Sequence, residues 1–136
     1  MFKFFIILSL SLSTAFADDV TSIKKVLNNY FQGYQRADSK LIQKAFHQDT
    51  KLISVDNNKL DALNLKDWVI SIDARRERED FRKGSMQILT LDITQETAMV
   101  KLHLNFEKFE FIDYLSFLKV ENKWIIVGKI FHFQEK

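Results

Sequence analysis

Residues 98–133, AMVKLHLNFEKFEFIDYLSFLKVENKWIIVGKIFHF, decide the fold of this chain. In residues 98–107 an apolar side chain stands at every second position and mostly polar side chains stand between them. That alternation predicts a strand with one buried face. Residues 109–120 and 123–133 are expected to be further strands, with a turn at Asn122. The chain therefore ends in a run of long antiparallel strands.

The first half of the chain has a helical period instead. Residues 18–37 are expected to form a helix that begins near two aspartates and carries one apolar stripe: Ile23, Val26, Leu27, Tyr30, Phe31 and Tyr34. Asp38 is a plausible N-cap of a second helix, and Asn64 of a third. Residues 50–55 and 59–62 between them are expected to pair as short strands around a turn.

This order of elements predicts an α+β protein, with N-terminal helices packed on one face of a curved antiparallel sheet. Gly33 lies inside the first predicted helix, where glycine costs about 1 kcal/mol relative to alanine. Close packing against a neighbouring segment would explain the glycine.

The last two predicted strands are apolar on both faces. A sheet with one solvated face should alternate more strictly than residues 109–120 and 123–133 do. The helices can cover one face, and a second subunit is the simplest cover for the other. The pattern therefore predicts a homodimer formed through the outer face of the sheet.

The N-terminus has the pattern of a signal peptide. Lys3 supplies a positive charge, residues 4–12 are largely apolar, and residues 15–17 (AFA) fit a cleavage site. The apolar run is shorter than the roughly 20 residues of a spanning helix. A buried N-terminal helix or a membrane anchor is the alternative. We expect a leader at 1–17 and one periplasmic or secreted domain at 18–136, with no membrane association after cleavage.

Composition excludes several classes of function. The chain has 136 residues, a formal net charge of +2 and no cysteine. Disulfides, thiol chemistry and cysteine-based metal sites are therefore excluded, and the charge gives no basis for nucleic-acid binding. The three histidines are scattered without paired spacing, and no glycine-rich phosphate loop occurs. We expect neither a metal nor a cofactor.

Three segments make the chain resemble the nuclear transport factor 2-like superfamily, in its putative lumazine-binding branch. They are residues 30–38 (YFQGYQRAD), 45–52 (AFHQDTKL) and 111–131 (FIDYLSFLKVENKWIIVGKIF). The resemblance implies a cone-shaped roll, an apolar cavity between the sheet and the first helix, and frequent dimers through the sheet. Ketosteroid isomerases of similar fold place a tyrosine of the first helix beside two acids inside the cone.

Asp113 is the main candidate for chemistry. It shares a strand face with Phe111 and other apolar residues, where loss of solvent would raise the pKa of a carboxyl group. It could instead be a structural carboxylate that accepts a backbone hydrogen bond or pairs with Arg or Lys. Tyr34 or Tyr30 could supply the isomerase-like tyrosine, or both could be core residues. No second acid can be placed beside them.

Two further features bear on a ligand. Trp68 and His132 complete the expected pocket, since His132 shares the parity of Trp124 and Ile126 on its strand. Residues 74–83 (ARREREDFRK) form the one dense charge run. Such a run is usually a solvated helix end or loop, and its alternative here is a positive rim for an anionic ligand.

Three hypotheses of function follow. The leading one is a non-catalytic protein that binds a small, largely apolar ligand in its pocket. The second is a dimeric interaction module with a filled cavity. The third is an isomerase, dehydratase or cyclase that uses Asp113 and a tyrosine.

Overall fold

A computed structural model describes the backbone of residues 7–136 and the side chains from residue 14 onward. The described chain folds as helices first and a long-stranded sheet last, as expected. Its elements are α1 (Ile7–Gln35), α2 (Ser39–Ala45), β1 (Lys51–Asp56), β2 (Lys59–Asn64), α3 (Leu65–Glu77), β3 (Gly84–Thr94), β4 (Thr97–Phe106), β5 (Phe109–Val120) and β6 (Lys123–Glu135).

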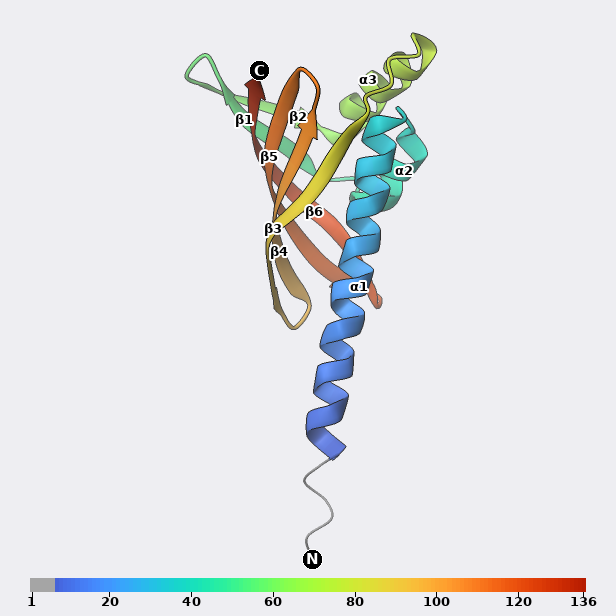
Figure 1. The fold of residues 1–136 in the computed structure, drawn as a ribbon, viewed down its shortest axis with the longest axis vertical. Coiled ribbons are helices and arrows are strands. Elements are labelled where there is room, and N and C mark those ends of the chain that lie inside the picture. Colours follow the sequence, from blue (N-terminus) through green and yellow to red (C-terminus); the bar gives the residue numbers. More distant parts are fainter. Residues whose placement is uncertain (1–6) are drawn as a thin grey trace, which may run out of the picture.

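The six strands form one curved, unclosed sheet in the order β2-β1-β6-β5-β4-β3 (Figure 1). The pairs β1–β2, β3–β4, β4–β5 and β5–β6 are antiparallel, but β1 lies parallel to β6, with Leu52 opposite Lys129 and Ile53 opposite Ile130. The curved sheet is antiparallel as expected except at this one pairing, which makes it a mixed sheet. The connection from β1 to β6 runs through β2, α3 and strands β3 to β5, and it brings β6 back beside β1 in the middle of the sheet.

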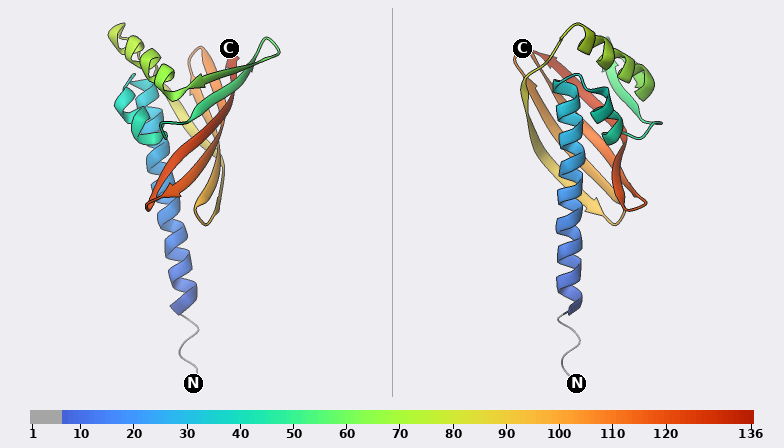
Figure 2. Two further views of the ribbon diagram at one scale, coloured as in Figure 1. Left: turned by 180° about the vertical axis from the view of Figure 1, so that it is seen from behind. Right: turned by 90° about the vertical axis from the view of Figure 1, so that its right-hand side faces the viewer.

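The helices cover one face of this sheet (Figure 2). The C-terminal half of α1 lies against the sheet, while its N-terminal part extends beyond the sheet edge (Figure 1). The helix begins at Ile7, within the predicted leader, and not near Asp18 as expected. The predicted positive end of the leader lies outside the described residues. Within the described part of the chain, no helix is long and apolar enough to cross a membrane.

Both predicted N-caps are present. One carboxylate oxygen of Asp38 accepts hydrogen bonds from the amides of Lys40 and Leu41, and the side-chain oxygen of Asn64 accepts one from the amide of Asp67. Each bond satisfies an amide that the first helical turn leaves unpaired. These caps begin α2 and α3, which close the end of the cone above the C-terminus of α1.

Gly33 is the point of closest approach between α1 and α2. A Cβ atom at this position would lie 3.0 Å from the carbonyl oxygen of Asp38 and 3.0 Å from Cδ1 of Ile42. The predicted reason for the glycine, close packing against a neighbour, is therefore confirmed. The contact holds the two helices in the angle that shapes the end of the cone.

A β-bulge in β6 reverses the side-chain alternation of that strand. The register with β5 shifts between Ser116 and Phe117, so that Val127 is an extra residue between Ile126 and Gly128. Trp124 and Ile126 face the core before the bulge, and Lys129 faces it afterwards. This single insertion places Lys129 in the interior.

The outer face of the sheet is apolar and solvent-exposed. Val55 and Leu60, which pair across β1 and β2, are 73% and 76% exposed, and Ile130 of β6 is 56% exposed. Together with Ile53, Tyr114 and His132 they line a shallow depression of about 310 Å³. The two-sided apolar pattern of the last strands thus corresponds to a real apolar surface.

Candidate ligand site

The interior between α1 and the sheet contains three polar side chains in contact. The Tyr30 hydroxyl of α1 donates a hydrogen bond to one carboxylate oxygen of Asp113 at 2.6 Å. The ammonium group of Lys129 donates to that same hydroxyl at 2.5 Å and lies 3.3 Å from the same carboxylate oxygen. All three side chains are buried, with Asp113 completely so. We call Tyr30, Asp113 and Lys129 the buried triad.

Adjacent strands bring the two charges together. In the β5–β6 pairing Leu115 lies opposite Lys129 and Asp113 lies opposite Phe131, so the two charged residues are diagonal neighbours on the inner face. Diagonal neighbours in a sheet are within reach of long side chains. The Lys129 side chain can therefore span the distance to Asp113 without distortion of either strand.

Aromatic rings surround the ammonium group of Lys129. Its nitrogen lies 4.8 Å from the ring centre of Tyr30 and 4.9 Å from that of Phe131. The rings of Trp68 and Phe111 are 5.4 and 5.6 Å away. These distances are typical of cation–π contacts, which partly replace the water that a buried ammonium group loses. We call these four rings the aromatic cage.

Burial and the Asp113 charge act in opposite directions on the pKa of Lys129 and in the same direction on that of Tyr30. Loss of solvent lowers the pKa of the Lys129 amine, while the charge and hydrogen bonding of Asp113 oppose that effect. Loss of solvent also raises the pKa of the Tyr30 hydroxyl, and the neighbouring Asp113 charge raises it further. The second carboxylate oxygen of Asp113 is buried and has no hydrogen-bond partner among residues 7–136. The carboxylate therefore retains an unused acceptor.

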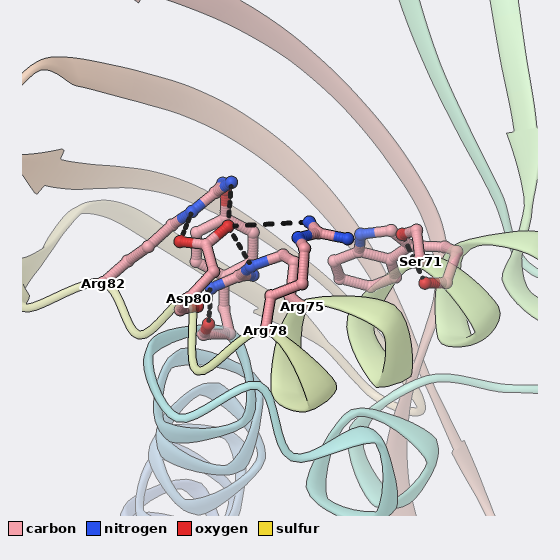
Figure 3. A network of polar contacts seen from close by, with 7 residues as sticks. Ser71, Arg75, Arg78, Asp80 and Arg82 are labelled. Atoms are coloured by element: carbon pink, nitrogen blue, oxygen red, sulfur yellow. Dashed lines mark hydrogen bonds and ion pairs between the residues drawn. The ribbon is translucent and has the colours of Figure 1, made fainter.

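A second polar cluster lies where α3 ends beside the C-terminal end of α1. Arg75 donates hydrogen bonds from Nη2 to the backbone oxygens of Tyr34 and Asp80, at 2.9 and 3.1 Å. Arg82 donates to both carboxylate oxygens of Asp80 and, at 2.6 Å, to the Tyr34 hydroxyl. Arg78 lies 3.9 Å from the same carboxylate. Figure 3 shows these arginines converging on Asp80.

Arg75, Arg78 and Arg82 line a pocket of about 330 Å³, which we call the arginine pocket. Trp68, Ser71 and Ile72 supply the rest of its wall from α3, together with Tyr34 from α1. Three guanidinium groups face a single carboxylate here, so the pocket has a net positive charge. The pKa of Asp80 is lowered, first by its hydrogen bond to Arg82, so the carboxylate is ionised at neutral pH.

Arg75 is the unusual member of the cluster. Its side chain is only 7% exposed, and its Nη1 has no hydrogen-bond partner within the described part of the chain. Burial lowers the pKa of this guanidinium group. The usual interpretation of a charge run as a solvated segment therefore fails at Arg75, because the guanidinium packs under the Tyr34 ring at 4.6 Å.

The structure divides the predicted site residues into three places. Tyr30 and Asp113 belong to the buried triad, and Phe111 belongs to the aromatic cage beside it. Tyr34 lines the arginine pocket. Trp68 belongs to both, since it lines the pocket and contributes a ring to the aromatic cage. Tyr30, and not Tyr34, is the tyrosine in contact with Asp113. That carboxylate is paired with a lysine, which was the structural alternative for it.

His132 was expected to reach the cavity mouth but lies on the outer face, where it lines the depression beside Ile130. The bulge at Val127 is the reason, because an extra residue exchanges the two faces of the strand beyond it. The same shift hid Lys129, which simple alternation would place outside. A charged residue within an otherwise apolar strand was the one signal that could have identified it.

No group of three or more potential metal ligands occurs among the described residues. The polar groups present are suited to binding anions, through the arginines, and to holding or moving a proton, through the buried triad.

Comparisons with known proteins agree with this architecture. The family model described as putative lumazine-binding matches residues 18–132. A nuclear transport factor 2-like protein of unknown function from Shewanella baltica superposes with a TM-score of 0.77 at 27% identity, over 88% of this chain and 97% of that one. A similar protein from Methylobacillus flagellatus gives 0.69 at 26% identity, over 86% and 93%.

Two further comparisons are more distant. A nuclear transport factor 2-like protein of unknown function from Silicibacter pomeroyi has a TM-score of 0.76 at 15% identity, over 87% of this chain and 98% of that one. A curated relative, Aldolase FrzH from a Cladobotryum species, is 21% identical over 103 residues, which are 76% of this chain and 82% of that protein. The first of these shows a shared fold alone.

Proposed function

This chain belongs to the putative lumazine-binding family of nuclear transport factor 2-like proteins, and we propose that it binds a small anionic molecule in the arginine pocket. The observation that carries the proposal is that Arg75, Arg78 and Arg82 line one pocket and have only the Asp80 carboxylate as a shared ion-pair partner. Guanidinium groups bind carboxylates and phosphates through paired, charge-assisted hydrogen bonds.

The unused donor of Arg75 supports this choice. A buried donor without a partner is rare and costs about 1–3 kcal/mol relative to a satisfied one. Nη1 of Arg75 is such a donor within residues 7–136, and an anionic oxygen in the pocket would satisfy it. Asp80 already accepts from Arg82 through both oxygens, so it cannot neutralise all three arginines.

The pocket also favours an apolar part in the ligand. The Trp68 indole and the Ile72 side chain supply apolar wall beside the guanidinium groups. The volume of about 330 Å³ is at the lower end of the range for small-molecule sites, which begins at about 300 Å³. We therefore propose a small amphipathic anion, in place of the largely apolar ligand that composition suggested.

The test uses benzoate, with benzamide as its uncharged counterpart, in titration calorimetry on the purified domain. Benzoate should bind and benzamide should not. Arg78→Gln should weaken benzoate binding by about fivefold, which corresponds to about 1 kcal/mol for one charge-assisted contact. Arg78 is the useful position because it is exposed and makes no hydrogen bond that holds the fold.

Arg76→Gln is the matched control, since Arg76 lies on the same helix and is exposed, but does not line the pocket. Equal effects of the two substitutions would mean that overall charge and not the pocket attracts the anion. Equal binding of benzoate and benzamide would refute the proposal.

A second copy of the chain is our proposal for the partner that covers the outer face of the sheet. The supporting observation is the depression lined by Val55, Leu60 and Ile130, all more than half exposed. An apolar patch related by a two-fold axis is complementary to itself. Sedimentation at micromolar concentration should give a dimer for the wild type and a monomer for Ile130→Lys.

Ile70→Lys is the control for the dimer, because Ile70 of α3 is 57% exposed and Ile130 is 56% exposed. The two substitutions add the same charge at equal exposure on different faces. A wild-type monomer, or dissociation by both substitutions alike, would contradict the proposed interface.

Export remains part of this proposal. Cleavage after Ala17 would remove the part of α1 that extends beyond the sheet and keep Asp19, which accepts hydrogen bonds from Lys119 and Trp124. The intact mass of the protein from an exported fraction should correspond to a chain that begins at Asp18. A full-length mass in that fraction would contradict the predicted cleavage.

A further inference from the structure

The amine of Lys129 occupies an environment that a purely structural lysine does not need. It lies inside the cone, 4% exposed, with a tyrosine hydroxyl at 2.5 Å and a carboxylate oxygen at 3.3 Å. Removing two charges from water costs several kcal/mol for each, which their mutual attraction rarely exceeds. Well-packed apolar residues would fill the same space at lower cost, so the pair is more informative about chemistry than about stability.

Burial weakens the hold of Lys129 on its proton. Loss of solvent lowers the pKa of the Lys129 amine, because the low-dielectric interior disfavours its charged form. Asp113 is the natural recipient of the released proton, since its second carboxylate oxygen accepts no hydrogen bond within the described residues. An amine that can pass its proton to a neighbouring carboxylate is a nucleophile with its own acid–base partner.

Trp68 connects the surroundings of this amine with the arginine pocket. The indole of Trp68 lies 5.4 Å from the Lys129 nitrogen and also lines the arginine pocket. Of the four cage residues, Trp68 is the one that also lines this pocket. Trp68 is therefore a wall that the arginine pocket and the aromatic cage share.

We propose that Lys129 is a nucleophilic amine that forms a Schiff base with a small aldehyde or ketone entering past Trp68, with Asp113 as its proton acceptor and donor. The amine nitrogen attacks the carbonyl carbon after its extra proton has passed to Asp113. The new carbon–nitrogen bond gives a carbinolamine. Its hydroxyl group then takes the proton back from Asp113 and leaves as water, so the iminium forms without any co-reactant.

Tyr30 is the positioning residue of this proposed site. Its hydroxyl contacts both the amine and the carboxylate, so it holds the two groups at a distance that allows proton transfer. Its ring is also part of the aromatic cage, and the carbonyl compound must fit within that cage. The inference therefore limits the substrate to a short, unbranched carbonyl compound. It does not depend on anion binding in the arginine pocket.

Reductive trapping tests the proposal on the wild-type protein. The folded protein is incubated at pH 7 with sodium cyanoborohydride and either propanal or pyruvate, and the modified lysines are mapped by mass spectrometry. Lys129 should be modified by propanal at least about tenfold faster than Lys101, a ratio that corresponds to about 1.4 kcal/mol in barrier. Lys101 is the matched reference because its amine lies 5.4 Å from the ring of Tyr114, on the outer face.

Variants separate a reactive amine from a merely accessible one. Trp68→Ala should accelerate the modification of Lys129, because it removes the wall that the pocket and the cage share, whereas Asp113→Asn should slow it by removing the proton acceptor. Circular dichroism shows whether each variant is folded, and the wild-type comparison with Lys101 stands even where a variant is not. The proposal would be overturned if Lys129 is modified more slowly than Lys101 both in the folded wild type and in folded Trp68→Ala.

The two carbonyl compounds keep this result distinct from the proposed anion binding. Propanal is uncharged, so its trapping on Lys129 depends on the amine alone. Faster trapping of pyruvate, with loss of that advantage in Arg78→Gln, would mean that the arginine pocket feeds the amine. Trapping of propanal without any binding of benzoate would support the amine and reject the anion pocket.

Discussion

The ammonium nitrogen of Lys129 lies 3.3 Å from a carboxylate oxygen of Asp113, and both side chains are sealed between α1 and the sheet. The two residues come from neighbouring strands, and a bulge in β6 is what turns Lys129 inward. Each charge is therefore the main compensation for the other.

Replacing only one of Lys129 and Asp113 should lower the free energy of unfolding more than replacing both. Lys129→Met leaves an uncompensated carboxylate and should lower the free energy of unfolding by about 3–5 kcal/mol. Asp113→Leu should have a similar cost. The double variant should be more stable than either single variant, because an apolar pair leaves no buried charge. Urea denaturation at pH 7 measures all four proteins, and simple additivity would contradict the buried pairing.

Two members of the buried triad should change the free energy of unfolding in opposite directions at alkaline pH. The folded protein binds the Lys129 proton less tightly than the unfolded chain, whose amine has the ordinary pKa of 10.5. Stability should therefore rise as pH approaches that value, since the unfolded state binds more protons. The pKa of Tyr30 is raised above 10.0, so above that pH the unfolded state binds fewer protons and stability should fall.

Variants assign the two limbs of this profile. Lys129→Met should lose the rise, and Tyr30→Phe should lose the fall above pH 10, with urea denaturation from pH 7 to pH 11 as the measurement. Exposed lysines and tyrosines are common to all three proteins and cancel in the comparison. An unchanged rise in Lys129→Met would assign it to another group.

Asp19 should stabilise the start of the mature chain in a pH-dependent way. Its carboxylate accepts hydrogen bonds from Lys119 and from the Trp124 indole, both at 2.9 Å, and the bond to Lys119 is the main cause that lowers its pKa. This contribution is present above the ordinary pKa of 3.8 and is lost as the pH falls through the lower folded value. Asp19→Asn should cost about 1 kcal/mol at pH 7.

Asp18→Asn is the control for this position, since Asp18 is exposed and adjacent. It should leave the midpoint of urea denaturation nearly unchanged. A loss of stability in Asp19→Asn that persists unchanged at pH 2 would show that the charge is not responsible.

Gly33→Ala should destabilise the protein although alanine is the better helix former by about 1 kcal/mol. The added methyl group would lie 3.0 Å from the backbone oxygen of Asp38, which cannot move without shifting the cap of α2. We expect a net loss of about 1–2 kcal/mol, within the range for overpacked sites.

Gly128→Ala is the matched control, because the nearest atom to its added methyl group, Cβ of Ser116, is 3.7 Å away. It should be neutral or slightly stabilising, since glycine weakens a strand. Thermal denaturation compares the two variants. A stabilised Gly33→Ala protein would show that the two helices are not in tight contact.

Local chemistry made most of the fold predictable. The caps at Asp38 and Asn64, the strand that contains Asp113 and the glycine contact at Gly33 each depend on a residue and its near neighbours in sequence. The inward direction of Asp113 followed from simple alternation, because β5 keeps its period up to Leu115. The helix α1 is longer than expected because it includes residues 7–17 of the predicted leader, whereas the predicted helix began at the expected cleavage site.

The site depended on relationships that a linear pattern does not contain. The bulge at Val127 exchanged Lys129 and His132 between the two faces, since an inserted residue shifts a period of two by one step. The burial of the Arg75 side chain was also not predicted, because it depends on contact with Tyr34 of α1, which is distant in sequence.

The sequence by itself determined the order of helices and strands, their caps and turns, the apolar outer face and the family of the fold, because these depend on local propensity and periodicity. Only the tertiary structure decided that Lys129 meets Asp113 and Tyr30, that β1 lies parallel to β6, and that Arg75 is buried against Tyr34. Those contacts join residues far apart in the chain, and the packing of α1 against a bulged sheet sets the distances between them.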